Sequence, residues 1–162
     1  MEPVIIALGS NLGDRQRVLH SAGLFLKSLS TTQFRKSSIW ESEPVGPAKY
    51  PFLNAVISID TQLTPQNLLK KLKQFERATG RDHHPVRWGP RILDLDIIAY
   101  GSLVIQSDTL IIPHPEFSKR LFVLLPLQQV EPEWSDPETG KTVSQLVENA
   151  PAMKIVQTTT SW

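Results

Sequence analysis

The stretch Arg87–Gly101, RWGPRILDLDIIAYG, governs how the rest of the chain is interpreted. Side chains two positions apart in a strand point to the same face of a sheet, so Asp94 and Asp96 are expected side by side. The leucine and isoleucine positions that alternate with them would face the core. Aspartate is uncommon in strands, and like charges that are neighbours on one face repel each other. The stretch therefore predicts a strand that enters the core with two carboxylates on one face.

A divalent cation bound through oxygen ligands would relieve the repulsion between these carboxylates. Mg²⁺ commonly uses one or two carboxylates together with substrate phosphates. The alternative is an ordinary solvated strand face. The run IIAY at Ile97–Tyr100 argues against it, because it implies that both faces of the strand soon become buried. We therefore predict a metal site at Asp94 and Asp96.

The loop before this strand is rich in arginine. Arg81, Arg87 and Arg91 lie within eleven residues, and the planar guanidinium group matches phosphate oxygens in bidentate fashion. Cations beside a metal-binding carboxylate pair are what a polyphosphate-handling enzyme needs. A merely solvated loop is the alternative, but Trp88, Gly89 and Pro90 would shape this one. No GxxxxGK[ST] motif is present, which excludes a Walker-type phosphate loop.

Length and composition favour a single domain over residues 1–162 with a substantial core. A net charge of +1 gives no general field for nucleic acid. No run approaches the roughly 18 apolar residues of a spanning helix, and the start MEPVIIALGSN lacks the features of a signal peptide. Cysteine is absent, which excludes disulfides and thiolate metal sites. We expect a cytoplasmic protein without membrane or nucleic-acid partners.

Periodicity and turn residues predict the order of elements. Strands are expected at 4–10, 34–45, 52–60, 92–100 and 103–106. Helices are expected after Asp14, at 64–80 and at 143–150. Asp14 can cap the first helix, whose apolar face would comprise Val18, Leu19, Ala22, Leu24, Phe25 and Leu26. The run LFVLLPLQQV is too apolar to be exposed. The order β-α-β-β-α-β predicts an α+β fold with a ferredoxin-like core, an antiparallel sheet flanked by helices.

Several segments together resemble a known family. The segments ALGSNLGD, FLNAV, FERATGR, RWGPRILDLDII and IPHPEFSKRLFVLLPL, in this order and spacing, are similar to 6-hydroxymethyl-7,8-dihydropterin pyrophosphokinase of folate biosynthesis. The resemblance runs from about Val4 to Glu133. It implies that pyrophosphate is transferred from ATP to the pterin hydroxymethyl group and that AMP leaves. It also implies two Mg²⁺ ions at Asp94 and Asp96, small-molecule substrates only, and a monomer. Nothing in the chain resembles the dihydropteroate synthase or aldolase domains sometimes fused to this family.

The resemblance also implies a pterin site. Phe52 and Phe122 would sandwich the heterocycle, Asn54 would bind its polar edge, and the backbone from Ser42 through Pro44 to Val45 would complete the pocket. Without the resemblance, two phenylalanines are more often core residues. Most family members carry tyrosine at the position of Phe52.

On the ATP side, the resemblance implies contacts from Glu76, Arg87, Trp88, Arg91, Ile97, His114 and Arg120. The catalytic set would be Arg81, Arg87, Arg91, Asp94 and Asp96. Three positions depart from the family pattern. Lys73 occupies a position where glutamine is expected, and His83 and His84 fall where relatives carry another arginine.

Two other classes of function remain open from the sequence. Another magnesium-dependent enzyme, such as a nucleotidyltransferase, would use the same acidic pair but release pyrophosphate rather than AMP. A non-catalytic ferredoxin-like RNA-binding module would need a basic sheet surface with paired aromatics. The acidic residues on the clearest strand make the RNA-binding class the least favoured.

Overall fold

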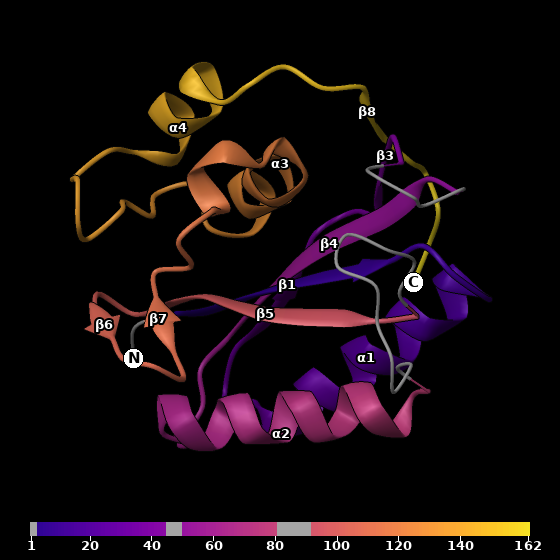
Figure 1. The fold of residues 1–162 in the computed structure, drawn as a ribbon, viewed down its shortest axis with the longest axis horizontal. Coiled ribbons are helices and arrows are strands. Elements are labelled where there is room, and N and C mark those ends of the chain that lie inside the picture. Colours follow the sequence, from indigo (N-terminus) through magenta and orange to yellow (C-terminus); the bar gives the residue numbers. More distant parts are fainter. Residues whose placement is uncertain (1–2, 45–49, 81–91) are drawn as a thin grey trace.

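The computed structural model describes residues 3–44, 50–80 and 92–162 (Figure 1). Its elements are β1 (Val4–Ser10), α1 (Arg15–Leu29), β2 (Phe34–Lys36), β3 (Trp40–Ser42), β4 (Phe52–Ile59), α2 (Pro65–Ala78), β5 (Asp94–Tyr100), β6 (Ile105–Gln106), β7 (Ile111–Ile112), a 3₁₀ turn (Phe117–Lys119), α3 (Leu121–Val130), α4 (Val143–Asn149) and β8 (Ile155–Gln157). Within these ranges, no helix is long and apolar enough to cross a membrane.

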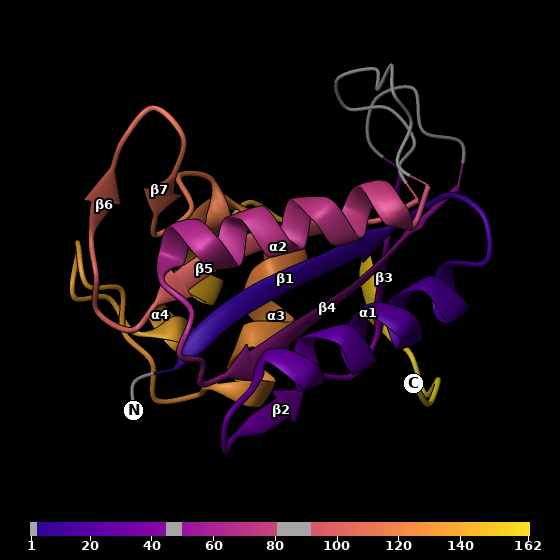
Figure 2. The ribbon, with the colours of Figure 1, turned by 90° about the horizontal axis from the view of Figure 1, so that it is seen from below.

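The main sheet has the strand order β5-β1-β4-β3-β8, with β2 also paired to β4. Every pairing in it is antiparallel. The short strands β6 and β7 form a separate hairpin-like pair. Helices α1 and α2 cover one face of the main sheet, and α3 and α4 lie on the other (Figures 1 and 2). The molecule is thus an α+β sandwich of three layers, as the sequence predicts at this level.

Each face of the sheet has its own hydrophobic core. The core under α1 and α2 includes Val4, Ile6, Leu8, Leu19, Leu26, Leu68, Leu72, Leu93, Leu95 and Ile97. The core under α3 and α4 includes Ile5, Val56, Ile98, Ala99, Val123, Leu124, Leu127 and Leu146. Alternation along β1 sends Ile5 to one core and Ile6 to the other, because successive strand residues point to opposite faces.

The prediction that the IIAY run becomes buried on both faces is confirmed. Opposite β1, the pairing of β5 shifts between Ile5 and Ile6, so that Ile5 pairs with Ala99 and Ile6 with Ile97. One extra residue, Ile98, is therefore accommodated in β5 as a β-bulge. Ile97 remains in the core under α1 and α2, whereas Ile98 and Ala99 enter the core under α3.

The single strand predicted over 34–45 is wrong, because two strands form. Lys36 pairs with Ile57 and Trp40 pairs with Asn54, so four steps on this side match three on β4. The extra residue lies in the segment 37–39. There the Ser37 hydroxyl accepts a hydrogen bond from the Val56 amide at 2.9 Å. An alternating pattern shows which residues face inward but does not show a single inserted residue.

Two further expectations need correction. Leu24 was placed on the apolar face of the first helix, but its side chain is 58% exposed. The position before it, Gly23, is buried and lies against the ring of Trp162. No strand was predicted beyond residue 150, yet β8 pairs with β3. The predicted cap of the first helix, Asp14, is confirmed, and Thr64 caps α2 in the same way.

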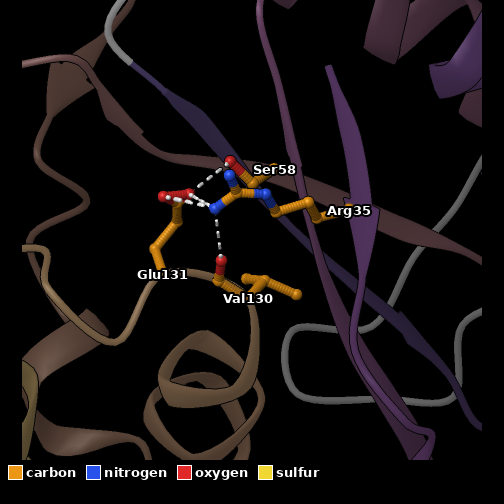
Figure 3. A network of polar contacts seen from close by, with 4 residues as sticks. All are labelled: Arg35, Ser58, Val130 and Glu131. Atoms are coloured by element: carbon orange, nitrogen blue, oxygen red, sulfur yellow. Dashed lines mark hydrogen bonds and ion pairs between the residues drawn. The ribbon is translucent and has the colours of Figure 1, made fainter.

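A polar cluster joins the end of α3 to the sheet (Figure 3). Arg35 Nη1 on β2 lies 3.3 Å from Glu131 Oε2 and donates to the Val130 carbonyl at 3.4 Å. The Ser58 hydroxyl on β4 donates to the same Glu131 carboxylate at 3.2 Å. Because Arg35 is about half exposed, the ion pair itself contributes little stability. Its effect is to set where the last turn of α3 sits.

Asp60, just after β4, is buried and anchors the turn between α1 and β2. Its carboxylate accepts hydrogen bonds from the amides of Thr32 and Gln33 at 3.0 and 2.7 Å and from the Thr32 hydroxyl. These donors stabilise the charged form and hold the pKa of the Asp60 carboxyl far below its ordinary value. The stabilisation is therefore complete above the unfolded-state pKa of about 4 and is lost as pH falls toward the folded-state pKa.

We expect Asp60→Asn to lower the free energy of unfolding at pH 7, because the amide replaces an acceptor by a donor facing two N–H groups. The difference from wild type should shrink as pH falls below about 4, where the wild-type carboxylate loses its advantage. Urea unfolding followed by circular dichroism between pH 2.5 and 7 measures this. Asp108→Asn, at an exposed aspartate, is the matched control. A difference independent of pH would contradict the account.

Candidate active site

The two aspartates of β5 lie where the sequence predicts. Leu93 and Leu95 are fully buried in the core under α1 and α2, whereas Asp94 and Asp96 are half-buried and alternate with them. Their face is therefore the α3 side of the sheet. Opposite them on β1 stand small residues, because Asp94 pairs with Gly9 and Asp96 with Ala7.

One row of paired residues runs across the sheet from the acidic strand β5 to Asn54, a residue assigned to the pterin. Gly9 lies between Asp94 on β5 and Asn54 on β4, and Asn54 in turn pairs with Trp40 on β3. Adjacent strands are about 4.8 Å apart, so the backbones of Asp94 and Asn54 are separated by about 10 Å. Because glycine has no side chain, the sheet between them offers an open floor.

The orientation of Asn54 follows from its partners. Its amide nitrogen donates to the Trp40 carbonyl at 3.1 Å and to the Ser42 hydroxyl at 2.9 Å. A carbonyl can only accept, so Nδ2 must face β3 and Oδ1 must face the other way, toward Gly9. Asn54 therefore presents a hydrogen-bond acceptor on the floor. Ser42, having accepted a bond, retains its hydroxyl proton for a further acceptor.

The remaining residues assigned to the pterin differ in burial and in their place in the fold. Phe52 is half-buried and pairs with Ser42 at the end of β4. Phe122 lies in the first turn of α3, packed against the core on the same side of the sheet. The guanidinium of Arg120 is 5.6 Å from the centre of the Phe122 ring. Pro44 is exposed, beyond the end of β3.

A surface hollow of about 250 Å³ adjoins the acidic strand and contains three of the predicted residues, Asp96, Ile97 and His114. Its other walls are Leu69, Lys73, Leu95, Ser107, Asp108, Thr109, Leu110, Ile111 and Pro115. Sequence reasoning did not assign Leu69 or the segment 107–111 to the site. The segment offers one signal, the exposed apolar residue Ile111 of β7, and such residues are common on any surface. A larger hollow beside α1, of about 490 Å³, contains none of the predicted site residues.

His114 is fixed as a neutral donor. Its backbone amide donates to the Ile98 carbonyl at 2.9 Å, and its Nδ1 accepts from the Glu116 amide at 3.1 Å. Burial lowers the pKa of His114, and the nearby charge of Asp96 opposes that shift without cancelling it. With Nδ1 occupied as an acceptor, the proton of the neutral ring is on Nε2. His114 can therefore donate one hydrogen bond to an anionic ligand.

Two side chains of α2 bind the outer edge of β5. The buried carboxylate of Glu76 accepts from the Leu95 amide at 2.6 Å, and Lys73 Nζ donates to the Leu95 carbonyl at 3.3 Å. Lys73 and Glu76 also form an ion pair at 3.3 Å. An edge strand otherwise exposes such backbone groups. Because Leu95 lies between Asp94 and Asp96, these contacts hold the acidic pair in place, and they give Lys73 a role that glutamine could fill only in part.

Several predicted residues lie outside the described part of the chain. They are Val45, Arg81, Arg87, Trp88 and Arg91, together with His83 and His84. Among residues 3–44, 50–80 and 92–162, no group of three or more His, Cys, Asp or Glu side chains could hold a metal. The donor set at Asp94 and Asp96 is thus two carboxylates, which suits a hard cation that takes its other oxygens from water and phosphate.

Comparison with known proteins identifies the family of the chain. The family model of 7,8-dihydro-6-hydroxymethylpterin-pyrophosphokinase matches residues 5–132. The chain belongs to this family of ATP-dependent pyrophosphokinases, which confirms the resemblance seen in the sequence. The 2-amino-4-hydroxy-6-hydroxymethyldihydropteridine pyrophosphokinase of Bacillus subtilis is 45% identical over 142 residues, 84% of each chain. The protein of the same name from Haemophilus influenzae is 38% identical over 154 residues, 94% of this chain and 95% of that one.

The fold has solved counterparts. A crystal structure of wild-type Plasmodium falciparum HPPK-DHPS with pteroate superposes with a TM-score of 0.69 at 14% identity. The match covers 91% of this chain and 42% of that one. At this identity the likeness concerns the fold alone. The chain spans less than half of that bifunctional protein.

Glu76→Ala should lower the free energy of unfolding by about 2–4 kcal/mol, because it leaves the Leu95 amide without a partner and breaks a buried ion pair. Glu76→Gln should lose less, since its amide oxygen can still accept from Leu95. Chemical denaturation at pH 7 measures both. Lys70→Ala, on the exposed face of α2, should change stability by less than about 0.5 kcal/mol. Equal stability of Glu76→Ala and the control would show that the edge contact is dispensable.

Proposed function

We propose that this protein transfers pyrophosphate from ATP to the hydroxymethyl group of 6-hydroxymethyl-7,8-dihydropterin, giving the pterin diphosphate and AMP in folate biosynthesis. The row Asp94–Gly9–Asn54 carries the proposal, because it sets a carboxylate and a buried hydrogen-bond acceptor on one open floor about 10 Å apart. The second carboxylate, Asp96, stands beside Asp94 on the same face, opposite Ala7. Family membership and the close relatives that bear the name of this activity support it.

In the reaction, the hydroxymethyl oxygen attacks the β-phosphorus in line, its proton is lost, and the bond to the α-phosphate oxygen breaks with AMP as leaving group. Asp94 and Asp96 would hold two Mg²⁺ ions, which neutralise charge on the triphosphate. Phosphoryl-type transfer depends mainly on position and charge, so the chain needs no covalent nucleophile. The edge contacts of Glu76 and Lys73 keep the carboxylates in register.

In this proposal the Nε2–H group of the neutral His114 ring donates a hydrogen bond to a phosphate oxygen, and Arg120 adds a positive charge beside it. Arg81, Arg87, Trp88 and Arg91 complete the ATP site in this proposal, as the family resemblance implies. The hollow between α2 and the β6–β7 segment accepts the nucleoside, with Ile97 and Leu69 as apolar wall.

The pterin lies over Gly9 in this proposal. Asn54 Oδ1 accepts a hydrogen bond from a ring N–H, and the Ser42 hydroxyl donates a hydrogen bond to the pterin. Phe52 and Phe122 supply the stacking faces, and the backbone at Pro44 and Val45 closes the edge. Phenylalanine at position 52 keeps the stacking face that a tyrosine would provide and lacks only its hydroxyl.

We further infer that residues 1–162 form one catalytic domain, monomeric and cytoplasmic, with no membrane or nucleic-acid partner. The core would be ferredoxin-like, which the order β5-β1-β4-β3 and its antiparallel pairings support. Sedimentation analysis of the purified protein tests the oligomeric state.

The function is tested by incubating the protein with ATP, Mg²⁺ and the reduced pterin alcohol and identifying the nucleotide product. AMP together with the pterin diphosphate is expected, and no AMP should form without the pterin. Release of pyrophosphate would indicate a nucleotidyltransferase instead. A protein that binds RNA and forms neither product would indicate the non-catalytic class.

Asp94→Asn and Asp96→Asn should each reduce turnover by roughly a hundredfold or more, because each removes a metal-binding charge. Both variants should remain folded, since loss of one of two repelling charges costs the unliganded protein little. Steady-state kinetics at saturating Mg²⁺, with circular dichroism as a check, measure the effect. Glu148→Gln, at an exposed position of α4, is the control. Turnover near wild type in either aspartate variant would remove the metal assignment.

Phe122→Ala should weaken pterin binding by roughly 1–3 kcal/mol, by analogy with base stacking on aromatic side chains, and leave ATP binding nearly unchanged. Calorimetry with each ligand separates the two. Phe25→Leu is a useful control, because Phe25 stacks on Phe75 at 4.2 Å between α1 and α2, away from the site. Equal losses for both ligands would identify Phe122 as a core residue only.

A further inference from the structure

The segment from Lys154 to Trp162, here called the strap, lies along the outer edge of β3. Figure 1 shows it as the yellow run that passes from α4 through β8 beside β3. Trp40, Glu41 and Ser42 pair with Gln157, Val156 and Ile155. Sequence reasoning assigned no role to these residues, and the family model matches only residues 5–132.

Hydrogen bonds extend this pairing beyond both ends of β3. The Glu43 amide donates to the Lys154 carbonyl at 3.2 Å. The amide and the hydroxyl of Thr158 both donate to the Ile39 carbonyl, at 2.9 and 2.8 Å. Bonded pairs alternate in an antiparallel ladder, which makes Glu41 and Val156 a bonded pair as well. The strap thus binds β3 along its full length.

The C-terminal end of the strap packs against the core under α1 and α2. The ring of Trp162 packs over Gly23 of α1, where an added Cβ would lie 3.3 Å from the ring. Its indole N–H donates to the Ser37 carbonyl at 2.9 Å. The Lys36 ammonium lies 5.0 Å from the ring centre and donates to the Trp162 carbonyl. These contacts hold both the strap and the segment that leads into β3.

β3 needs this support because it is short. A three-residue strand that pairs with one neighbour only is marginally stable. Without the strap, β3 would pair with β4 alone. Yet β3 positions the site, since the Trp40 carbonyl and the Ser42 hydroxyl fix the amide of Asn54. The ATP hollow is built from α2, β5 and the β6–β7 segment instead. In the sheet, β1 and β4 separate these two regions.

We propose that the strap is a positioning element for the pterin half of the site, and that Val156 and Trp162 act through β3 on Asn54 and Ser42. This inference rests on the proposed function. Release of the strap should loosen the pterin contacts and spare those to ATP, which a general loss of stability would not do.

Val156 offers a matched pair of variants, because its side chain is 66% exposed and belongs to neither hydrophobic core. Val156→Pro removes the N–H that pairs with Glu41, whereas Val156→Thr keeps the N–H and the β-branched shape. We expect Val156→Pro to raise the KM for the pterin by roughly tenfold and to change the KM for ATP by less than about twofold. Val156→Thr should behave as wild type. Hydrogen exchange of the amides at 39–43 should be faster only in the proline variant.

Trp162→Ala tests the anchor independently and replaces Val156→Pro if that variant does not fold. It should shift the KM for the pterin in the same direction and again spare ATP. Equal KM changes for both substrates, or an unchanged pterin KM despite faster exchange in β3, would overturn the inference while the function stands. A wild-type protein that forms no AMP from ATP and the pterin would overturn both.

Discussion

Strand β1 constrains the whole molecule, because it is hydrogen-bonded on both sides and covered on both faces. Ile5 and Ile6 point into opposite cores, so neither helix layer can shift along the strand without exposing apolar surface. Toward the end of β1, the face that carries Ile5 changes from large to small residues. Ala7 and Gly9 leave room there between β5 and β4. The same strand therefore fixes the register of the sheet and provides the floor that separates the acidic pair from Asn54.

The two edges of the sheet are protected in different ways, and each edge serves one half of the site. Side chains of Lys73 and Glu76 bind the backbone of β5 next to the carboxylates. A further strand, β8, binds β3 next to Asn54 and Ser42, which the proposal assigns to the pterin. Unprotected edges are prone to aggregation in any sheet. In this protein the protection also orders the side chains that we propose to contact the substrates.

Much of this could be predicted from the sequence. Alternation identified the inward positions of β5, and the cap Asp14 was identified correctly at the start of α1. The acidic pair could be found because aspartates are unexpected between buried leucines. The resemblance to a family then supplied roles that no spacing shows, such as that of Asn54. These roles stay predictions, as do those of the arginines at 81–91, which lie outside the described residues.

Other features could not be read from the sequence for physical reasons. The segment 107–111, which lines the hollow proposed for ATP, has no distinctive sequence pattern, and only the folded chain brings it to α2. The edge contact of Glu76 depends on a backbone amide nineteen positions away. The strap has little apolar periodicity, because backbone pairing and one tryptophan hold it. Sequence patterns report burial well, but they say little about which backbone groups meet.

The extra residue between β2 and β3 leaves the register of β3 unchanged. Four steps from Lys36 to Trp40 match three on β4, so loss of one residue from 37–39 would give an unbroken ladder with Trp40 still opposite Asn54. Such a deletion would remove only the bulge, which bends a strand and increases its twist locally. Among related chains, the length of this connection can therefore vary by one residue while Trp40 and Ser42 keep their places beside Asn54. Selection at this place acts on the direction of the edge strand more than on its register.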